Sequence, residues 1–321
     1  MSNVSACILS YNRADFLCEA IESVLQQTIK PVEILVFDNG SDSVVYERVR
    51  PYLERGITWI GSDVNHSAIW NFGRAIETAR SEFIFVLHDD DRLCQDFVEK
   101  QVNFLMSNHE VGVVTCNGYL INELGERTGG LLRPNFKTSC IELYRSPASV
   151  AIIYASDHCL PFSPAVYRAK FARAKNLREE YGKVVDAVFF CDLAKVCALA
   201  YQLQPLYECR VHGAQDSSYF PAIELERLTV YFDSYAEGSL AERKELKNLL
   251  MRQHTSRQLI RIYRAISTPP LELRFLSELA GVTHRRFSFL AATSILMAAL
   301  LKRINIWASQ KKFKKHKNFF P

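Results

Sequence analysis

Four consecutive residues whose side chains can bind metal, His88, Asp89, Asp90 and Asp91, directly follow the apolar run at residues 83–87. Three adjacent carboxylates repel one another by roughly 1 to 4 kcal/mol per pair at a few ångströms, depending on the local dielectric. A bound cation removes this repulsion, and oxygen ligands favour a hard ion such as Mg²⁺ or Mn²⁺ over zinc. Because proteins commonly hold Mg²⁺ through one or two carboxylates together with phosphate oxygens, the motif predicts a metal that also binds a nucleotide diphosphate. The alternative is a solvated acidic turn in which Asp89 or Asp91 caps the next helix.

The elements before this motif alternate between short apolar runs and amphipathic segments. The spacing of the apolar residues predicts strands over residues 4–9, 32–37, 57–61 and 83–87, and helices over 14–27 and 67–79. This alternation is typical of a parallel sheet that helices cover on both faces, and ligands of such sheets bind at the carboxyl ends of the strands. Polar segments follow three of the strands, "SYNR", "DNGSD" and "HDDD". They should meet at one edge of the sheet.

The usual phosphate-binding loops are absent from the sequence. No GxGxxG follows the first strand and there is no GxxxxGK[ST], which disfavours a dinucleotide dehydrogenase and a P-loop kinase. A metal ion would then have to neutralise the phosphates.

The second part of the chain has a weaker pattern. Residues 122–136 predict an exposed hairpin or loop, 184–200 a helix, 201–218 one or two edge strands that end in a polar loop, and the residues after 220 further helices. The nine cysteines are scattered without CxxC pairs, which indicates reduced thiols rather than a disulfide framework or a zinc site.

Two segments of the first part resemble a known family. "CILSYNRADFLCEAIESVLQQTIKPVEILVFDNGSDS" and "NHSAIWNFGRAIETARSEFIFVLHDDD" look like the nucleotide-sugar half of the family 2 glycosyltransferases, inverting enzymes with the GT-A fold. A later segment, "VVDAVFFCDLAKVCALAYQLQPLYECRVHGAQDSS", is similar to that family's "ED...L" helix and "YRxH" strand and loop. The resemblance implies an α/β fold, with a GT-A type, mostly parallel sheet flanked by helices in a domain over residues 1–220. Residues 221–321 would form a helical C-terminal extension.

The resemblance also implies roles for single residues. In the preferred alignment with the family's Asp-x-Asp-Asp motif, His88 takes the place of the first aspartate, Asp89 is the variable residue, and Asp90 and Asp91 both match. An alternative frame begins one residue later, at Asp89. The implied residues are Ser10, Tyr11, Arg13, Asp38, Asn65 and Asp89 for the nucleotide sugar, Asp90 and His212 for the metal, and Asp186 for the base that deprotonates the acceptor hydroxyl. Arg210 and Ser217 are further candidates for phosphate contacts.

Each of these assignments has a structural alternative, and two positions depart from the family pattern. Tyr11 could be an ordinary rim aromatic, Asp38 a turn cap, Asp186 a carboxylate at a helix N-terminus and His212 a hydrogen-bonded loop residue. Ser67 replaces the glycine of the family's "NxG", and Val185 stands where the family often has Glu. Asp192, six residues after Asp186, faces elsewhere on a helix and is interpreted as structural.

The charge is divided unevenly along the chain. Residues 240–321 hold 17 Lys and Arg against 4 Asp and Glu, whereas residues 1–239 hold 22 against 31. Within this basic part, residues 287–301 carry no charge, but a bilayer span needs roughly 20 residues. Two interpretations remain open, a helix that lies in an anionic membrane surface and a helix that packs on the enzyme or in a dimer. Nucleic-acid binding is disfavoured, because no known nucleic-acid module is present.

The sequence therefore predicts a metal-dependent, inverting glycosyltransferase. It would use Mg²⁺ or Mn²⁺ to move a sugar from a nucleotide-diphosphate donor to a hydroxyl of a glycan or lipid-linked acceptor in cell-surface polysaccharide synthesis. The first residues, "MSNVSACILSYNR", lack the pattern of a secretory signal, so the expected location is the cytoplasm, at the inner face of the cell membrane. The alternatives are a sugar nucleotidyltransferase and a non-catalytic nucleotide-binding or membrane-docking protein.

Overall fold

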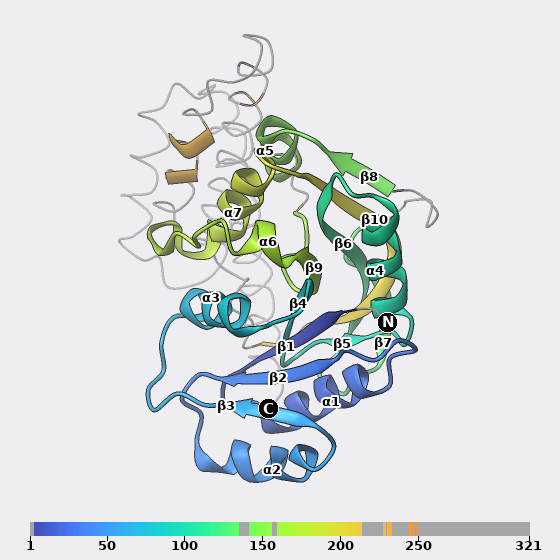
Figure 1. The fold of residues 1–321 in the computed structure, drawn as a ribbon, viewed down its shortest axis with the longest axis vertical. Coiled ribbons are helices and arrows are strands. Elements are labelled where there is room, and N and C mark those ends of the chain that lie inside the picture. The colour runs from blue at the N-terminus through green and yellow to red at the C-terminus, as the bar shows by residue number, and fades with distance from the viewer. Residues whose placement is uncertain are drawn as a thin grey trace, which may run out of the picture. The chain divides into compact units, whose positions relative to one another are not determined.

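The computed structural model describes residues 3–134, 141–155 and 159–213, together with single positions between 227 and 248. Its first part contains every strand and helix that the sequence predicts there, and two helices, α2 and α4, that the sequence analysis did not identify (Figure 1). The elements are β1 (Val4–Ser10), α1 (Ala14–Leu25), β2 (Glu33–Asp38), α2 (Ser43–Leu53), β3 (Ile57–Ile60), α3 (Ala68–Thr78), β4 (Phe83–His88), β5 (Arg92–Leu93) and α4 (Phe97–Ser107).

The first four strands form a parallel sheet in the order β3-β2-β1-β4. Every residue of β1 is buried, as expected for a strand with helices on both faces. The register pairs Ser10 with Asp38 and Leu9 with His88. The three polar segments that follow these strands therefore start at the same level of the sheet, which confirms that they share one edge.

The second part extends the sheet with strands of both directions. Its elements are β6 (Val111–Ile121), β7 (Arg127–Leu131), β8 (Ile141–Tyr144), α5 (Pro147–Ala155), β9 (Ala165–Arg168), α6 (Ala169–Ala172), the 3₁₀ helix η1 (Glu179–Val184), α7 (Val185–Leu193) and β10 (Ala198–Arg210). The order continues from β4 as β9-β6-β10-β5, with β9 antiparallel to both β4 and β6 and β10 parallel to β6. The sheet is thus parallel in its first half and mixed in its second half.

Two predictions for the second part need correction, and one is confirmed. The predicted helix over 184–200 ends at Leu193, because the apolar run from Ala198 onward is a buried strand, which periodicity alone does not distinguish from a buried helix. This strand, β10, is not at an edge, since β6 pairs with one side of it and β5 and β8 with the other. The predicted hairpin is present as β6 and β7.

Helices pack on both faces of the sheet (Figure 1). On one face, α1, α2 and α4 contribute to an aliphatic core with alternate residues of β1 and β4. On the other face, α3 packs on β1, β2 and β4. There an aromatic cluster joins α3, β9 and α7, made of Phe72, Phe162, Tyr167, Phe189 and Phe190. This cluster holds α7, which begins with the predicted base Asp186, against the sheet.

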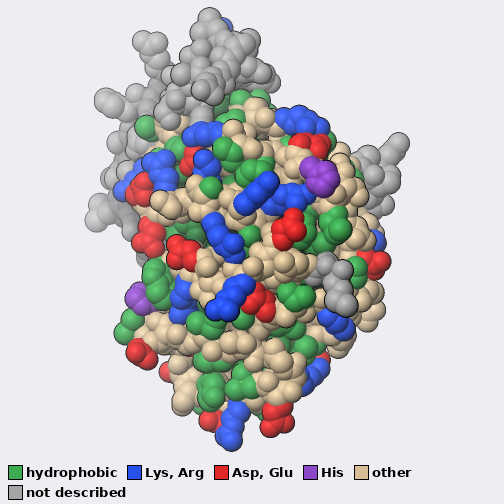
Figure 2. Space-filling model, in the orientation of Figure 1, with side chains coloured by type: hydrophobic (Ala, Val, Ile, Leu, Met, Phe, Trp, Pro, Cys, Tyr) green, Lys and Arg blue, Asp and Glu red, His purple; other side chains and the backbone are tan. Residues whose placement is uncertain are grey.

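The predicted C-terminal extension falls almost entirely outside the described residues. Its boundary at residue 220, its helical character and the membrane role of residues 287–301 stay predictions. Within the described part of the chain, no helix has the length and apolar character needed to cross a membrane. On the face shown in Figure 2, positive and negative side chains are interspersed, in contrast to the basic excess of residues 240–321.

Candidate active site

The loop after β1 is tied to the loop after β2. Asn12 has a left-handed backbone with φ of 53°, a conformation that asparagine tolerates better than most residues. Its backbone N–H donates to Ser41 Oγ at 2.9 Å, and its side-chain oxygen accepts from the backbone N–H of Asp42 at 2.8 Å. The "SYNR" and "DNGSD" segments therefore form one continuous rim at the sheet edge.

Two buried oxygens on this rim have no hydrogen-bond partner among the described residues. Asp38, only 4% exposed, uses Oδ2 to accept from the backbone N–H groups of Gly40 and Ser41, so it does cap the turn. Its Oδ1 and the buried Ser10 Oγ make no hydrogen bond with the described residues. Leaving buried acceptors unpaired costs about 1–3 kcal/mol each, so both atoms fit a ligand that donates N–H or O–H groups. Tyr11, 41% exposed, adds an aromatic ring to the same loop.

Asn39 connects this rim to the loop between β3 and α3. Its side-chain nitrogen donates to Asn65 Oδ1 at 2.8 Å and to the carbonyl of His66 at 2.9 Å, and its oxygen accepts from the N–H of His66 at 3.1 Å. Gly40 allows the close approach, because a Cβ there would lie 2.5 Å from the carbonyl carbon of Val64. Asn65 is thus placed by Asn39, a residue that the sequence analysis did not single out although it lies inside the "DNGSD" motif.

The acidic turn after β4 is only partly open to solvent. Asp89 and Asp91 are 1% and 6% exposed, so the predicted alternative of a solvated, helix-capping turn is wrong for both. Asp89 accepts from the backbone N–H of Tyr11 at 3.0 Å and pairs with Arg13 Nη2 at 2.7 Å. Asp90 Oδ2 lies 2.7 Å from Arg13 Nη1 and 3.0 Å from His212 Nε2. Arg13 therefore bridges two of the three carboxylates.

The three aspartates differ in how readily they ionise. Burial raises the pKa of Asp89 to about 7, because its effect exceeds the opposing attraction of Arg13. Burial and the neighbouring Asp90 together raise the pKa of Asp91 well above its usual range. Burial also acts on Asp90, but His88, Arg13 and His212 outweigh it, so the pKa of Asp90 is lowered. Asp90 is the carboxylate of the three that most firmly keeps its charge.

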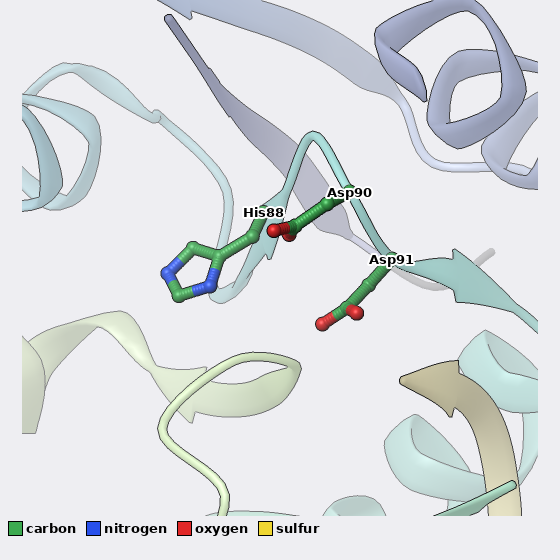
Figure 3. A group of neighbouring side chains, drawn as sticks. All are labelled: His88, Asp90 and Asp91. Carbon is green, nitrogen blue, oxygen red and sulfur yellow. The ribbon is translucent and has the colours of Figure 1, made fainter. Parts of the chain in front are cut away.

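His88, Asp90 and Asp91 form a candidate cation site. Their ligand atoms lie within 4.8 Å of one another, and Figure 3 shows the three side chains projecting from the same turn. Two carboxylates make a hard donor set that suits Mg²⁺ or Mn²⁺. Asp89 is not part of this group; its oxygens contact Tyr11 and Arg13, and His212 contacts the group through Asp90. The group coincides with the first sequence frame, in which His88, Asp90 and Asp91 stand at the three aspartate positions of the motif and Asp89 is the variable residue.

Asp186 is the second residue of α7, and three hydrogen bonds involve it or segments close to it in the sequence. Tyr154 of α5 donates from its hydroxyl to Asp186 Oδ2 at 3.1 Å. Three residues after Leu160, Ser163 Oγ accepts from the backbone N–H of His88, the last residue of β4, at 3.0 Å. Ser67 Oγ, at the N-terminus of α3, donates to Glu179 of η1 at 2.6 Å, just before α7 begins. Burial raises the pKa of Asp186 to about 6, still low enough for the carboxylate to be ionised at neutral pH.

The sequence analysis also named Asp192, Arg210 and Ser217. Asp192 pairs with Lys195 at 2.7 Å, in agreement with its structural interpretation. The side chain of Arg210 is completely buried, so the phosphate contact predicted for it is not supported. Ser217 lies outside the described residues.

We predict that Asn39→Ala loosens the loop between β3 and α3. The substitution removes three hydrogen bonds and should lower the free energy of unfolding by about 1–3 kcal/mol, since it leaves buried groups unpaired. Hydrogen exchange read at the His66 amide is the direct measurement, with acceleration expected in the variant. Asn108→Ala is the matched control, because it removes a side-chain hydrogen bond to Phe104 at the end of α4. Unchanged protection of His66 in Asn39→Ala would contradict this role.

Comparison of the sequence with known proteins gives one family. The family model described as Glycosyl transferase family 2 matches residues 5–191. An uncharacterized glycosyltransferase of Haemophilus influenzae is 23% identical over 250 residues, which cover 72% of this chain and 74% of that protein. The uncharacterized glycosyltransferase YwdF of Bacillus subtilis is 32% identical over 98 residues, which cover 30% of this chain and 36% of that protein.

Solved structures with a similar fold include TarS and a mannosyltransferase. S. aureus TarS 1–349 has a TM-score of 0.63 at 16% identity, over 88% of this chain and 79% of that one, and was also solved in complex with UDP-GlcNAc. The mannosyltransferase PcManGT from Pyrobaculum calidifontis, in complex with GDP-Man and Mn²⁺, has a TM-score of 0.53 at 15% identity, over 94% of this chain and 87% of that one. Because the family model spans more than half of the chain, from β1 to α7, the protein belongs to glycosyl transferase family 2 and has the mixed α/β fold of GT-A glycosyltransferases.

Proposed function

We propose that this glycosyltransferase moves a sugar from a nucleotide-diphosphate donor to a hydroxyl of a glycan or lipid-linked acceptor, with inversion at the anomeric carbon and with Mg²⁺ or Mn²⁺ as cofactor. One observation carries the proposal. The buried oxygens of Ser10 and Asp38, which have no partner among the described residues, lie at the same sheet edge as the acidic turn, in which Asp90 keeps its charge. Family membership favours this function over the two alternatives, a sugar nucleotidyltransferase and a non-catalytic binding protein.

The rim after β1 and β2 would bind the nucleoside. Asp38 Oδ1 and Ser10 Oγ would accept hydrogen bonds from the base or the ribose, and Tyr11 would offer a face for stacking. Asn65, held by Asn39, would border the same site. The complexes of TarS with UDP-GlcNAc and of PcManGT with GDP-Man support a nucleotide sugar as the donor class.

The acidic turn would bind the diphosphate part of the donor. Asp90, with its lowered pKa, would be the main metal ligand, and His88, Asp91 and His212 lie within reach of its site. A divalent cation there would stabilise the negative charge that develops on the leaving diphosphate. Arg13 is paired with both Asp89 and Asp90, so it keeps the two carboxylates together. It would also add a positive charge beside the phosphates.

Asp186 would act as the base. It would take the proton of the acceptor hydroxyl while the hydroxyl oxygen attacks the anomeric carbon on the side opposite the diphosphate, which inverts the configuration. With a pKa of about 6, the carboxylate is mostly ionised at neutral pH and still basic enough to accept a proton. The hydrogen bond from Tyr154 orients it.

The acceptor and the location are proposed from the sequence. The basic excess of residues 240–321 suits attraction to an anionic membrane surface, where lipid-linked acceptors of cell-surface polysaccharide synthesis are found. We place the enzyme in the cytoplasm, peripheral to the inner face of the membrane, and expect no nucleic-acid partner.

The base assignment predicts that Asp186→Asn loses transfer but still binds the donor nucleotide. The amide cannot accept the proton, so the rate of sugar transfer should fall by about 10²- to 10⁴-fold. Nucleotide affinity, measured by calorimetry, should stay within twofold of the unsubstituted protein. Asp192→Asn is the control on the same helix, since Asp192 pairs with Lys195, and it should keep normal transfer. Normal transfer by Asp186→Asn would rule out Asp186 as the base.

The pKa of Asp186 predicts the acid side of the pH profile. Protonation inactivates the base, so kcat/KM should fall as the pH drops through about 6. Tyr154 donates to the ionised carboxylate and thereby lowers its pKa, so Tyr154→Phe should move this fall to higher pH. The profiles of both proteins, measured with saturating metal, test this expectation. If kcat/KM falls at the same pH in Tyr154→Phe as in the unsubstituted protein, a group other than Asp186 controls the fall.

A further inference from the structure

Arg210, the last residue of β10, has the largest of the fully buried side chains in the described part of the chain. A buried guanidinium is costly unless its N–H groups find acceptors, and it stays charged at every physiological pH. The N–H groups of Arg210 must therefore be paired with acceptors inside the protein. These acceptors indicate the role of Arg210.

The guanidinium joins three segments that are distant in the sequence. Nη2 pairs with Glu19 Oε2 of α1 at 2.6 Å. Nη1 donates to the carbonyls of Asn122 and Glu123, in the turn between β6 and β7, at 3.2 and 2.9 Å. Nε donates to the carbonyl of Asp90 at 2.9 Å. The acidic turn is thus anchored to α1 and to the β6–β7 turn through one side chain.

The main chain at Arg210 contacts the same acidic turn a second time. Its N–H donates to Asp91 Oδ1 at 3.0 Å. The next residue, Val211, continues the ladder by donating to the carbonyl of Ile121 at 2.8 Å, and His212 then lies 3.0 Å from Asp90 Oδ2. The end of β10 therefore touches the backbone of Asp90, the carboxylate of Asp90 and the carboxylate of Asp91.

We propose that Arg210 is a positioning residue that fixes the Asp90 and Asp91 carboxylates at the spacing needed to bind a divalent cation. The inference rests on the proposed metal-dependent function and gives Arg210 a part in it that is distinct from phosphate binding. The guanidinium is required, because its fixed fork of donors binds acceptors on three segments at once. A lysine ammonium keeps the charge but cannot span all three.

The chain offers a matched control in the same charge network. Glu19 also pairs with Arg92 at 3.2 Å, Arg92 pairs with Glu208 at 2.7 Å, and Glu208 pairs with Arg127 at 2.7 Å. Arg127 is half exposed and is bonded to the far end of this network. Arg127→Lys therefore alters the network without touching the acidic turn directly.

The test is Mn²⁺ binding to the full-length protein, followed by electron spin resonance of the free ion, for Arg210→Lys and Arg127→Lys. We expect the dissociation constant for Mn²⁺ to rise at least tenfold in Arg210→Lys and to stay within twofold in Arg127→Lys. Binding of UDP and GDP without metal, measured by calorimetry, should be the same in all three proteins. A merely structural role of Arg210 would weaken metal-free nucleotide binding as well, or would leave Mn²⁺ binding unchanged, and either result overturns the proposal.

A second variant keeps the proposal testable if Arg210→Lys fails to fold. Glu19→Gln removes the charge that holds Nη2 but leaves the other contacts of Arg210 in place, so a rise of at least threefold in the Mn²⁺ dissociation constant is expected. Affinity equal to that of the unsubstituted protein would overturn the proposal. If the unsubstituted protein itself binds no Mn²⁺, the metal part of the proposed function fails and this inference fails with it. Equal Mn²⁺ affinity in all variants, by contrast, rejects only the role of Arg210.

Discussion

Electrostatic repulsion among three adjacent aspartates is the constraint around which this sheet edge is organised. Each close pair of ionised carboxylates costs roughly 1 to 4 kcal/mol, and two of the three carboxyls are buried. The protein offsets this cost with donors from separate elements: Arg13 and the N–H of Tyr11 from the loop after β1, and His212 and the N–H of Arg210 from the end of β10. The turn is therefore contacted from both the loop after β1 and the end of β10.

The sheet brings them together. Parallel pairing of β1 with β4 sets the loop of Tyr11 and Arg13 beside the acidic turn, and β10 runs parallel to β6 so that its carboxyl end reaches the same edge. An arginine contacts the acidic turn from each of two sides, and the two arginines differ in their exposure to solvent. Arg13 binds Asp89 and Asp90 from the loop after β1, whereas Arg210 binds the turn from within the protein and is closed to solvent. One arginine is available to a ligand and the other supports the structure beneath it.

Much of the first half of the fold could be predicted from the sequence, because continuous apolar runs and helical spacing are local signals. The position of Asp38 and Asp90 at the sheet edge could be predicted, because the turns that hold them come at the ends of such strands. Strand β10 was missed in part, since the run from Ala198 has the composition of a helix as well as of a buried strand. The partners of Arg210 and Asn39 could not be predicted, because they lie 26 to 191 residues away in the sequence and depend on the packed structure.

The most direct test of the account is calorimetric binding of UDP, GDP, dTDP and CDP, with and without Mn²⁺, to the protein and to Asp90→Asn. The account predicts that at least one nucleotide binds more tightly with Mn²⁺, and that Asp90→Asn abolishes this gain while it keeps the weaker binding without metal. Equal binding with and without Mn²⁺ in the unsubstituted protein, or a full Mn²⁺ effect in Asp90→Asn, would contradict it.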